Sequence, residues 1–209
     1  MPTPKPMASE ALGLPHNSVE SAYATRNKHR LRKILAGTGI PSPRFDLFSI
    51  DDAPAKFAPR LGFPCIVKPL SLSASRGVIR ADNPDEFVEA FRRVATILRT
   101  LDVAEQGSAE VQGILVERFI PGIEVALEGM LLHGELKVLA IFDKPDPLDG
   151  PFFEETLYIT PSRTPTYVQK EIAACTAQAA QALGLQEGPV HAELRFNDEG
   201  PWLIEIAAR

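Results

Sequence analysis

The stretch that decides the fold is VHAELRFNDEGPWLIEI, which occupies residues 190–206. Two runs that alternate apolar and polar residues flank Asn197-Asp198-Glu199-Gly200, a pattern typical of a β-hairpin. We expect a three-residue loop at 198–200, with Gly200 in the left-handed position that follows a type I turn. Residue 197 then pairs with 201, residue 195 with 203 and residue 193 with 205. A register shifted by one residue would expose half of the apolar side chains.

This register divides the hairpin side chains between two faces. The apolar face is expected to hold Val190, Ala192, Leu194, Phe196, Trp202, Ile204 and Ile206. The polar face is expected to hold His191, Glu193, Arg195, Leu203 and Glu205. Glu193 and Glu205 become direct cross-strand neighbours, with Cβ atoms about 5 Å apart. At an effective dielectric constant of about 20 they repel by roughly 3 kcal/mol, a large share of a typical net stability of about 5–15 kcal/mol.

Two kinds of positive charge can compensate for this repulsion. Arg195 and Arg209 can pair with the carboxylates, or a divalent cation can be held by both of them. Proteins usually hold Mg²⁺ with one or two carboxylates, while water and substrate phosphates complete its shell. The four histidines and two cysteines show no metal-ligand spacing, so the acids favour Mg²⁺, with Mn²⁺ as an alternative, over Zn²⁺.

Composition limits the function classes. The chain has 209 residues, and its hydrophobic fraction of 44% indicates a folded protein. Its net charge of −5 argues against a nucleic-acid partner. No apolar run approaches the ~20 residues that cross a membrane. The two cysteines cannot form a disulfide framework, so we expect a reducing, cytoplasmic compartment. Composition leaves open whether the protein forms homo-oligomers.

Along the chain, α and β elements occur in mixed order with several hairpins, which predicts an α+β fold with mainly antiparallel sheets. We expect a proline-rich extended segment at 1–17 and a helical entry region at 18–62, whose helix begins at Ser18 and runs to about residue 36. A first lobe is predicted at 63–105 and a second at 106–209, separated by the polar linker 101–113. Strands are expected at 65–70, 77–80, 114–119, 124–132, 135–142, near 153–159, 190–196 and 202–207, and further helices at 84–98 and 166–183.

Four motifs in this order resemble those of the ATP-grasp enzymes, most closely the carboxylate–amine and L-amino acid ligases and the biotin carboxylase and carbamoyl-phosphate synthase domains. The first is Asn27-Lys28, where the resemblance implies that Lys28 reaches the nucleotide phosphates. The second is Val67-Lys68-Pro69, followed by a loop at 71–77. It implies that Lys68 contacts the α- and β-phosphates and that the loop closes over the γ-phosphate, with contacts from Ser71, Ser73, Ser75 and Gly77.

The third motif is VERFIPGIE at 116–124, which resembles the hinge that binds adenine. The resemblance implies backbone contacts to adenine from Glu117, Arg118, Phe119 and Ile120, and a contact of Glu124 with the ribose hydroxyls. The fourth is the hairpin itself. Here the family's two metal-binding acids fall on Glu193 and Glu205, in agreement with the pair deduced from the register, and its catalytic arginine falls on Arg209.

Several features depart from the family pattern or admit another explanation. The loop at 71–77 has one glycine where many members have several, and Ala207 stands where many members have an asparagine metal ligand. Lys68 can instead form a structural salt bridge, because an unpaired ammonium in an apolar strand is costly. The basic stretch 26–33 is expected to be the solvated face of a helix, and residues 143–155 resemble a substrate-side segment of amino-acid ligases.

The resemblance implies two α+β lobes that clasp a nucleotide between them, and an ATP- and Mg²⁺-dependent ligase. ATP would convert a small carboxylate to an acyl phosphate, and an amine would then attack it to form a C–N bond. Phosphorylation of bicarbonate or formate, and nucleotide binding without catalysis, remain alternatives. Because the chain ends at the arginine of the last motif, we expect an incomplete enzyme that binds ATP without turning it over alone.

Overall fold

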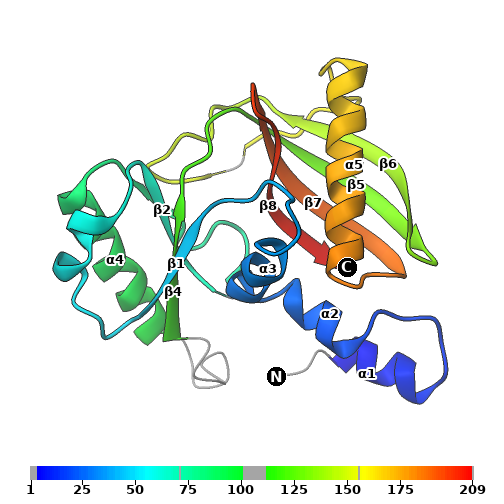
Figure 1. Ribbon diagram of the computed structural model, residues 1–209, viewed down its shortest axis with the longest axis horizontal. Helices are drawn as coiled ribbons and strands as arrows, with labels where there is room; N and C mark the ends of the chain where they lie inside the picture. The colour runs from blue at the N-terminus through cyan, green and yellow to red at the C-terminus, as the bar shows by residue number, and fades with distance from the viewer. Residues whose placement is uncertain (1–3, 71, 101–111, 155, 209) are drawn as a thin grey trace. The chain divides into compact units, whose positions relative to one another are not determined.

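A computed structural model of the chain describes residues 4–70, 72–100, 112–154 and 156–208 (Figure 1). These residues form two compact units. Unit 1 comprises the described residues of 43–119 and 148–154, and unit 2 comprises the described residues up to Ser42 together with 120–147 and 156–208. Each unit has its own antiparallel sheet and its own hydrophobic core, so the predicted mixture of α and β structure is confirmed.

Unit 1 is built on a four-stranded sheet in the order β1-β4-β2-β3. Its strands are β1 (Phe45–Ser49), β4 (Gly113–Arg118), β2 (Cys65–Pro69) and β3 (Ile79–Ala81). Helix α4 (Pro84–Arg99) lies along the sheet and begins as predicted, because the Asn83 side chain accepts a hydrogen bond from the Glu86 N–H and Pro84 occupies the first turn (Figure 1). Its apolar stripe, which includes Phe87, Phe91 and Val94, is buried against the sheet. Two short 3₁₀ helices, η1 (Pro54–Lys56) and η2 (Ala58–Arg60), complete the unit.

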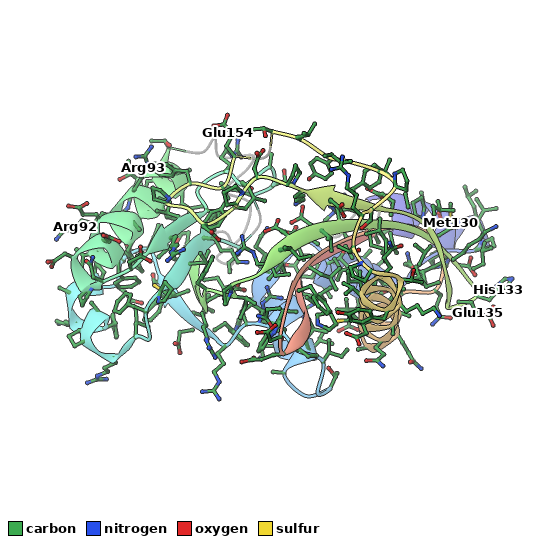
Figure 2. All side chains as sticks on the ribbon, turned by 90° about the horizontal axis from the view of Figure 1, so that it is seen from above. Arg92, Arg93, Met130, His133, Glu135 and Glu154 are labelled. Carbon is green, nitrogen blue, oxygen red and sulfur yellow. The ribbon has the colours of Figure 1, made fainter. Side chains whose placement is uncertain are left out.

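Unit 2 is built on a four-stranded sheet in the order β6-β5-β7-β8. Its strands are β5 (Ile123–Leu132), β6 (Glu135–Lys144), β7 (Gly188–Asn197) and β8 (Gly200–Ala208). Helix α5 (Thr166–Ala182) lies across one face of the sheet, and Ile172 and Ala179 from the helix are fully buried with Leu127 and Leu194 from the strands (Figure 1). In Figure 2, His133 and Glu135 lie at the tip of the β5–β6 hairpin. The opposite face of the sheet carries charged side chains such as Glu124, Lys144 and Glu193 together with apolar ones such as Ala126 and Phe142.

The β7–β8 hairpin differs from its predicted form in two details. Asn197 pairs with Gly200, so the loop has two residues rather than three, and the pairing continues with Leu194 opposite Leu203. A β-bulge at Ile204 then adds one residue to β8 and restores the predicted pairing of Glu193 with Glu205. As a consequence Leu203 is fully buried, whereas its predicted place was on the polar face.

The predictions for the N-terminal region were wrong in two places. Residues Pro4–Ala11 form helix α1 rather than an extended segment, because prolines in a first turn remove only N–H groups that have no helical partner. The single helix expected from Ser18 is divided into α2 (Val19–Ala24) and α3 (Lys28–Leu35). The Asn27 side chain accepts a hydrogen bond from the Arg30 N–H and thereby begins a new helix. No helix in the described ranges is long and apolar enough to cross a membrane.

The boundaries between the units also differ from the predicted ones. Strand β4 pairs with both β1 and β2, so it belongs to unit 1, and the change of unit falls after Phe119 rather than near residue 106. Most of the predicted linker, 101–111, lies outside the described residues. The described residues of 153–159, which leave out residue 155, do not form the expected strand. Isolated bridges join Phe152 to Ile79 and Ile159 to Asp143.

Gly122 provides a test of the β5–β7 packing. Its φ of +126° favours glycine, and a Cβ there would lie 2.3 Å from the backbone oxygen of Phe196. We expect Gly122→Ala to lower the free energy of unfolding in urea by about 2 kcal/mol or more. Gly37→Ala is the control, because a Cβ at Gly37 meets only the Ile34 carbonyl at 3.9 Å. Equal stability of the two variants would contradict the close approach.

The two thiols provide a test of burial in each core. Burial raises the pKa of Cys65 to about 12 and that of Cys175 to about 11. At pH 8 roughly one Cys65 thiol in ten thousand is ionised, and we expect negligible reaction of either cysteine with a thiol-specific disulfide reagent in the folded chain. Both should react within minutes in denaturant, because unfolding restores the ordinary thiol pKa. Above pH 9 the unfolded chain releases thiol protons that the folded chain retains, so these groups make stability decrease with rising pH.

Candidate functional site

The polar face of the unit 2 sheet carries a set of charged side chains. Side chains alternate between the two faces of a strand, and directly paired residues share a face. The register therefore brings charged residues of all four strands together, with Lys28 from α3 beside them. We call this set the carboxylate face: Lys28, Glu124, Glu128, Lys144, His191, Glu193, Arg195 and Glu205.

Glu193 and Glu205 lie directly opposite each other, as the sequence predicted. Lysines compensate for their repulsion. The Nζ atom of Lys144 lies 3.1 Å from Glu193 Oε1, and the Nζ atom of Lys28 lies 3.4 Å from Glu205 Oε2. The expected partner, Arg195, instead donates from Nε to Glu124 Oε2 at 3.0 Å and from a terminal nitrogen to the Ile120 carbonyl. Arg209, the other expected partner, lies outside the described residues.

Lys144 links the two acids to which the resemblance gives different roles. Besides Glu193, its Nζ atom donates to Glu124 Oε1 at 2.9 Å. Its side chain is only 2% exposed. The register explains this position, because Lys144 at the end of β6 pairs with Glu124 on β5. Lys144 was not among the site residues predicted from the sequence.

His191 connects Glu193 to a further acid. Its Nδ1 atom lies 2.7 Å from Glu128 Oε1 and its Nε2 atom 3.3 Å from Glu193 Oε1. The hydrogen bond with Glu193 raises the pKa of His191, burial opposes this, and the bond with Glu128 adds to the rise. Burial alone would raise the pKa of Glu193, but His191 and Lys144 together lower it to about 2. Glu193 is therefore an anion at neutral pH.

The donor set fits a hard divalent cation that brings part of its own coordination shell. Within the described ranges no group of three or more His, Cys, Asp or Glu side chains could hold a metal ion. The Glu193–Glu205 pair supplies carboxylate oxygens, which Mg²⁺ prefers, and phosphate or water oxygens would have to supply the rest. The arrangement therefore fits a metal that arrives with a phosphorylated ligand better than a permanently bound one.

In unit 1, Lys68 forms a buried ion pair with Glu117. The Lys68 Nζ atom lies 2.7 Å from Glu117 Oε2, and the two side chains are 5% and 3% exposed. β2 and β4 pair with Ile66 opposite Glu117, which sets Lys68 diagonally across from that acid on the same face. The salt bridge considered for Lys68 from the sequence is therefore present. Removing either partner of a buried ion pair is usually strongly destabilising.

The predicted adenine hinge already uses two of its backbone donors. The Arg118 N–H donates to the Arg44 carbonyl at 2.9 Å and the Phe119 N–H to the Pro64 carbonyl at 3.1 Å. Phe119 is buried, with the Arg80 guanidinium 4.3 Å from its ring centroid. A ligand bound along this segment would have to use other backbone groups, such as carbonyls.

The serine loop, residues 72–77 in the described part, curls tightly despite its single glycine. Ala74 and Ser75 adopt φ values of 56° and 51°, and Gly77 adopts 77°. Left-handed non-glycine residues are uncommon and are found disproportionately at functional sites. Gly77 has little room for a side chain, because a Cβ would lie 3.3 Å from Pro69. Ser71 lies outside the described residues.

A pocket of about 220 Å³ adjoins the serine loop in unit 1. Ser75 and Gly77 line it together with Arg93 from α4 and the segment Phe152–Glu154. The Arg93 guanidinium lies 5.0 Å from the Phe152 ring centroid, and Figure 2 shows Arg93 and Glu154 on these two segments. Part of the expected substrate-side segment is thus packed beside the expected phosphate loop.

Residues 61–209 match the model of the ATP-grasp domain. Alanine–anticapsin ligase of Bacillus subtilis strain 168 is 29% identical over 220 aligned positions, which cover 99% of this chain and 46% of that protein. D-Alanine–D-alanine ligase of Nitrosococcus oceani is 28% identical over 94% of this chain and 60% of its own length. The chain thus spans about half the length of the first curated relatives it matches.

Solved structures agree with the family match. L-amino acid ligase from Bacillus licheniformis superposes with a TM-score of 0.84 at 35% identity, over 97% of this chain and 47% of that chain. A D-alanine–D-alanine ligase from Bacillus anthracis complexed with ATP gives a TM-score of 0.73 at 20% identity, over 99% and 63%, a likeness of fold alone. The predicted fold class is confirmed. Because the family match covers well over half of the chain, the chain belongs to the ATP-grasp domain family.

Proposed function

We propose that this chain is the ATP-binding part of an ATP- and Mg²⁺-dependent ligase that joins a small carboxylate to an amine. Membership of the ATP-grasp family supports nucleotide binding. The printed names of the relatives, alanine–anticapsin ligase, D-alanine–D-alanine ligase and L-amino acid ligase, support amino acids as the substrate class. Two free, buried cysteines agree with a cytoplasmic location.

The observation that carries the proposal is the opposed Glu193–Glu205 pair on the carboxylate face. Both acids are ligands of the type that Mg²⁺ takes when phosphates fill its remaining positions. A bound Mg²⁺ would supply charge neutralisation to the transferred phosphoryl group. Lys28, which already contacts Glu205, is within reach of groups bound at that acid and would hold a phosphate. Glu124, fixed by Lys144 and Arg195, would accept hydrogen bonds from the ribose.

Residues of unit 1 would hold the rest of the nucleotide. Lys68, oriented by Glu117, would donate to phosphate oxygens, and the serine loop would donate from its backbone and from Ser73 and Ser75. The segment 117–120 would contact adenine through the backbone groups that are not used within the sheet. Ser71 and Arg209 keep their expected roles in phosphate binding and catalysis as proposals.

The reaction would proceed in two steps. A carboxylate oxygen of the first substrate attacks the γ-phosphorus, the bond to the ADP oxygen breaks, and an acyl phosphate forms. The amine nitrogen then attacks the acyl carbon, phosphate leaves, and the nitrogen loses a proton. The protein contributes mainly by positioning the groups and by stabilising negative charge, for which Arg209 is the proposed residue.

Glu205→Gln tests the metal assignment in the protein that carries this chain. The amide keeps the size of the side chain but removes the anionic ligand, so we expect Mg²⁺-dependent ADP release to fall at least about 100-fold. Glu199→Gln, in the exposed loop of the same hairpin, is the matched control and should retain the full rate. Undiminished turnover by Glu205→Gln would refute the metal assignment.

The same assay separates the candidate reactions. ADP release should require amino acids and should not occur with bicarbonate or formate as the only acceptor. Release with bicarbonate or formate alone would replace the ligase proposal by carboxyphosphate or formyl phosphate chemistry. Binding of Mg·ATP without ADP release for any acceptor would indicate a nucleotide-binding module.

Lys28 allows a test with the chain itself. We expect Lys28→Ala to weaken Mg·ATP binding about tenfold, measured by calorimetry, because a charge-assisted contact to phosphate is lost. Lys33→Ala, which removes an exposed lysine from the same helix, should leave the dissociation constant unchanged. An equal effect of both substitutions would mean that only the general charge of α3 matters.

A further inference from the structure

The carboxylate face contains positive charge of its own where the proposed function requires a metal. Lys144 and Lys28 contact the two acids assigned to the metal, Glu193 and Glu205. We propose that these two lysines act as resident counter-ions, which hold the acid pair in place without nucleotide and keep free divalent cations out of it. This inference rests on the proposed function, because it takes Glu193 and Glu205 as the metal ligands.

Lys144 occupies a buried position between two carboxylates. Its Nζ atom donates to Glu193 Oε1 and to Glu124 Oε1, and its side chain is almost fully buried. An ammonium with two carboxylate partners in a buried position cannot swing into solvent without losing both ion pairs, which would leave Glu124 with Arg195 and Glu193 with His191 alone. A cation that approaches Glu193 therefore meets Lys144 already bound to one of the two carboxylate oxygens.

Acids and basic residues are matched in pairs on the carboxylate face. Glu193 and Lys144, Glu205 and Lys28, and Glu124 and Arg195 form three neighbouring pairs of opposite charge. A free divalent cation added to the Glu193–Lys144 and Glu205–Lys28 pairs would give the cation and these four side chains together a net charge of +2. Phosphate oxygens that arrive with the cation offset this excess, and they also offer Lys28 an alternative acceptor. The lysines thus favour the cation–nucleotide complex over the free cation.

Glu193 and Glu205 need positive partners in the absence of metal. Two opposed carboxylates on neighbouring strands destabilise a sheet when they lack positive partners. Here each has a lysine partner, and Glu193 has His191 in addition. The chain therefore folds without metal, in contrast to structural metal sites, whose ligands depend on the ion for folding.

Binding of Mn²⁺ to the nucleotide-free chain tests this role, with electron paramagnetic resonance as the measure of free Mn²⁺. We expect no binding by the unsubstituted chain at concentrations up to about one millimolar. Lys144→Met and Lys28→Met keep much of the side-chain volume but remove the charge, and each should bind Mn²⁺ at least about tenfold more tightly. Lys137→Met, an exposed lysine of the same strand β6, is the control and should bind no more than the unsubstituted chain.

A second substitution locates the gained site. Addition of Glu193→Gln to either lysine variant should abolish the gained Mn²⁺ binding, because the carboxylate ligand is then lost. Circular dichroism reports whether each variant folds. If Lys144→Met does not fold, the result with Lys28→Met alone decides whether the proposal holds. We expect Lys28→Met to fold, because Lys28 lies on a helix and retains some solvent exposure.

Two results would overturn the proposal: tight Mn²⁺ binding by the unsubstituted chain without nucleotide, or no gain in any folded lysine variant. A repeat of the titration with ADP present tests the proposed function separately. A further outcome is that the unsubstituted chain fails to bind Mn²⁺ with ADP while the lysine variants gain Mn²⁺ binding without ADP. This result would refute the nucleotide-bound metal and leave the counter-ion role intact.

Discussion

The arrangement of unit 2 depends on one constraint, the direct opposition of two carboxylates across β7 and β8. Glu193 and Glu205 share a face of the sheet, so opposite charge has to be supplied from neighbouring elements. Lys144 at the end of β6 and Lys28 at the start of α3 supply it. Lys144 also donates to Glu124, with which it pairs across β5 and β6, and so connects Glu193 with Glu124.

The hairpin shows how far alternation along a strand can be used for prediction. The pairing of Glu193 with Glu205 was predicted from a three-residue loop, whereas the protein has a two-residue loop and a bulge at Ile204. Beyond the bulge, the extra residue in β8 compensates for the shorter loop. The predicted pairing of the two acids was therefore correct, whereas Leu203 was assigned to the wrong face. Hydrophobic alternation fixes the average register of a strand, but a bulge changes it locally without a clear sequence signal.

Lys144 was missed for the same physical reason. Near the His133–Gly134 turn, Leu132 pairs with Glu135, and uninterrupted pairing from there would set Asp143 opposite Glu124. A bulge at Leu139 shifts the register, so that Lys144 takes that place and lies on the carboxylate face. The resemblance identified acids on separate strands. The position of Lys144, which joins two of these acids, depends on the bulge at Leu139, and this bulge is seen only in the structure. Backbone donors of the hinge were similarly unpredictable, because their partners, Arg44 and Pro64, come from distant parts of the chain.

The path of the chain through the two units has a consequence for how this protein can vary. Unit 1 is closed by residues 148–154, which return to it after the chain has formed β5 and β6 in unit 2. Phe152 forms an isolated β-bridge with Ile79, and the Arg93 guanidinium lies over its ring. The Pro151 carbonyl accepts a hydrogen bond from the Arg80 N–H. The expected substrate-side segment is thus also a structural strap of unit 1. Exchange of this segment between related chains would therefore alter the stability of unit 1 together with the pocket that the segment lines.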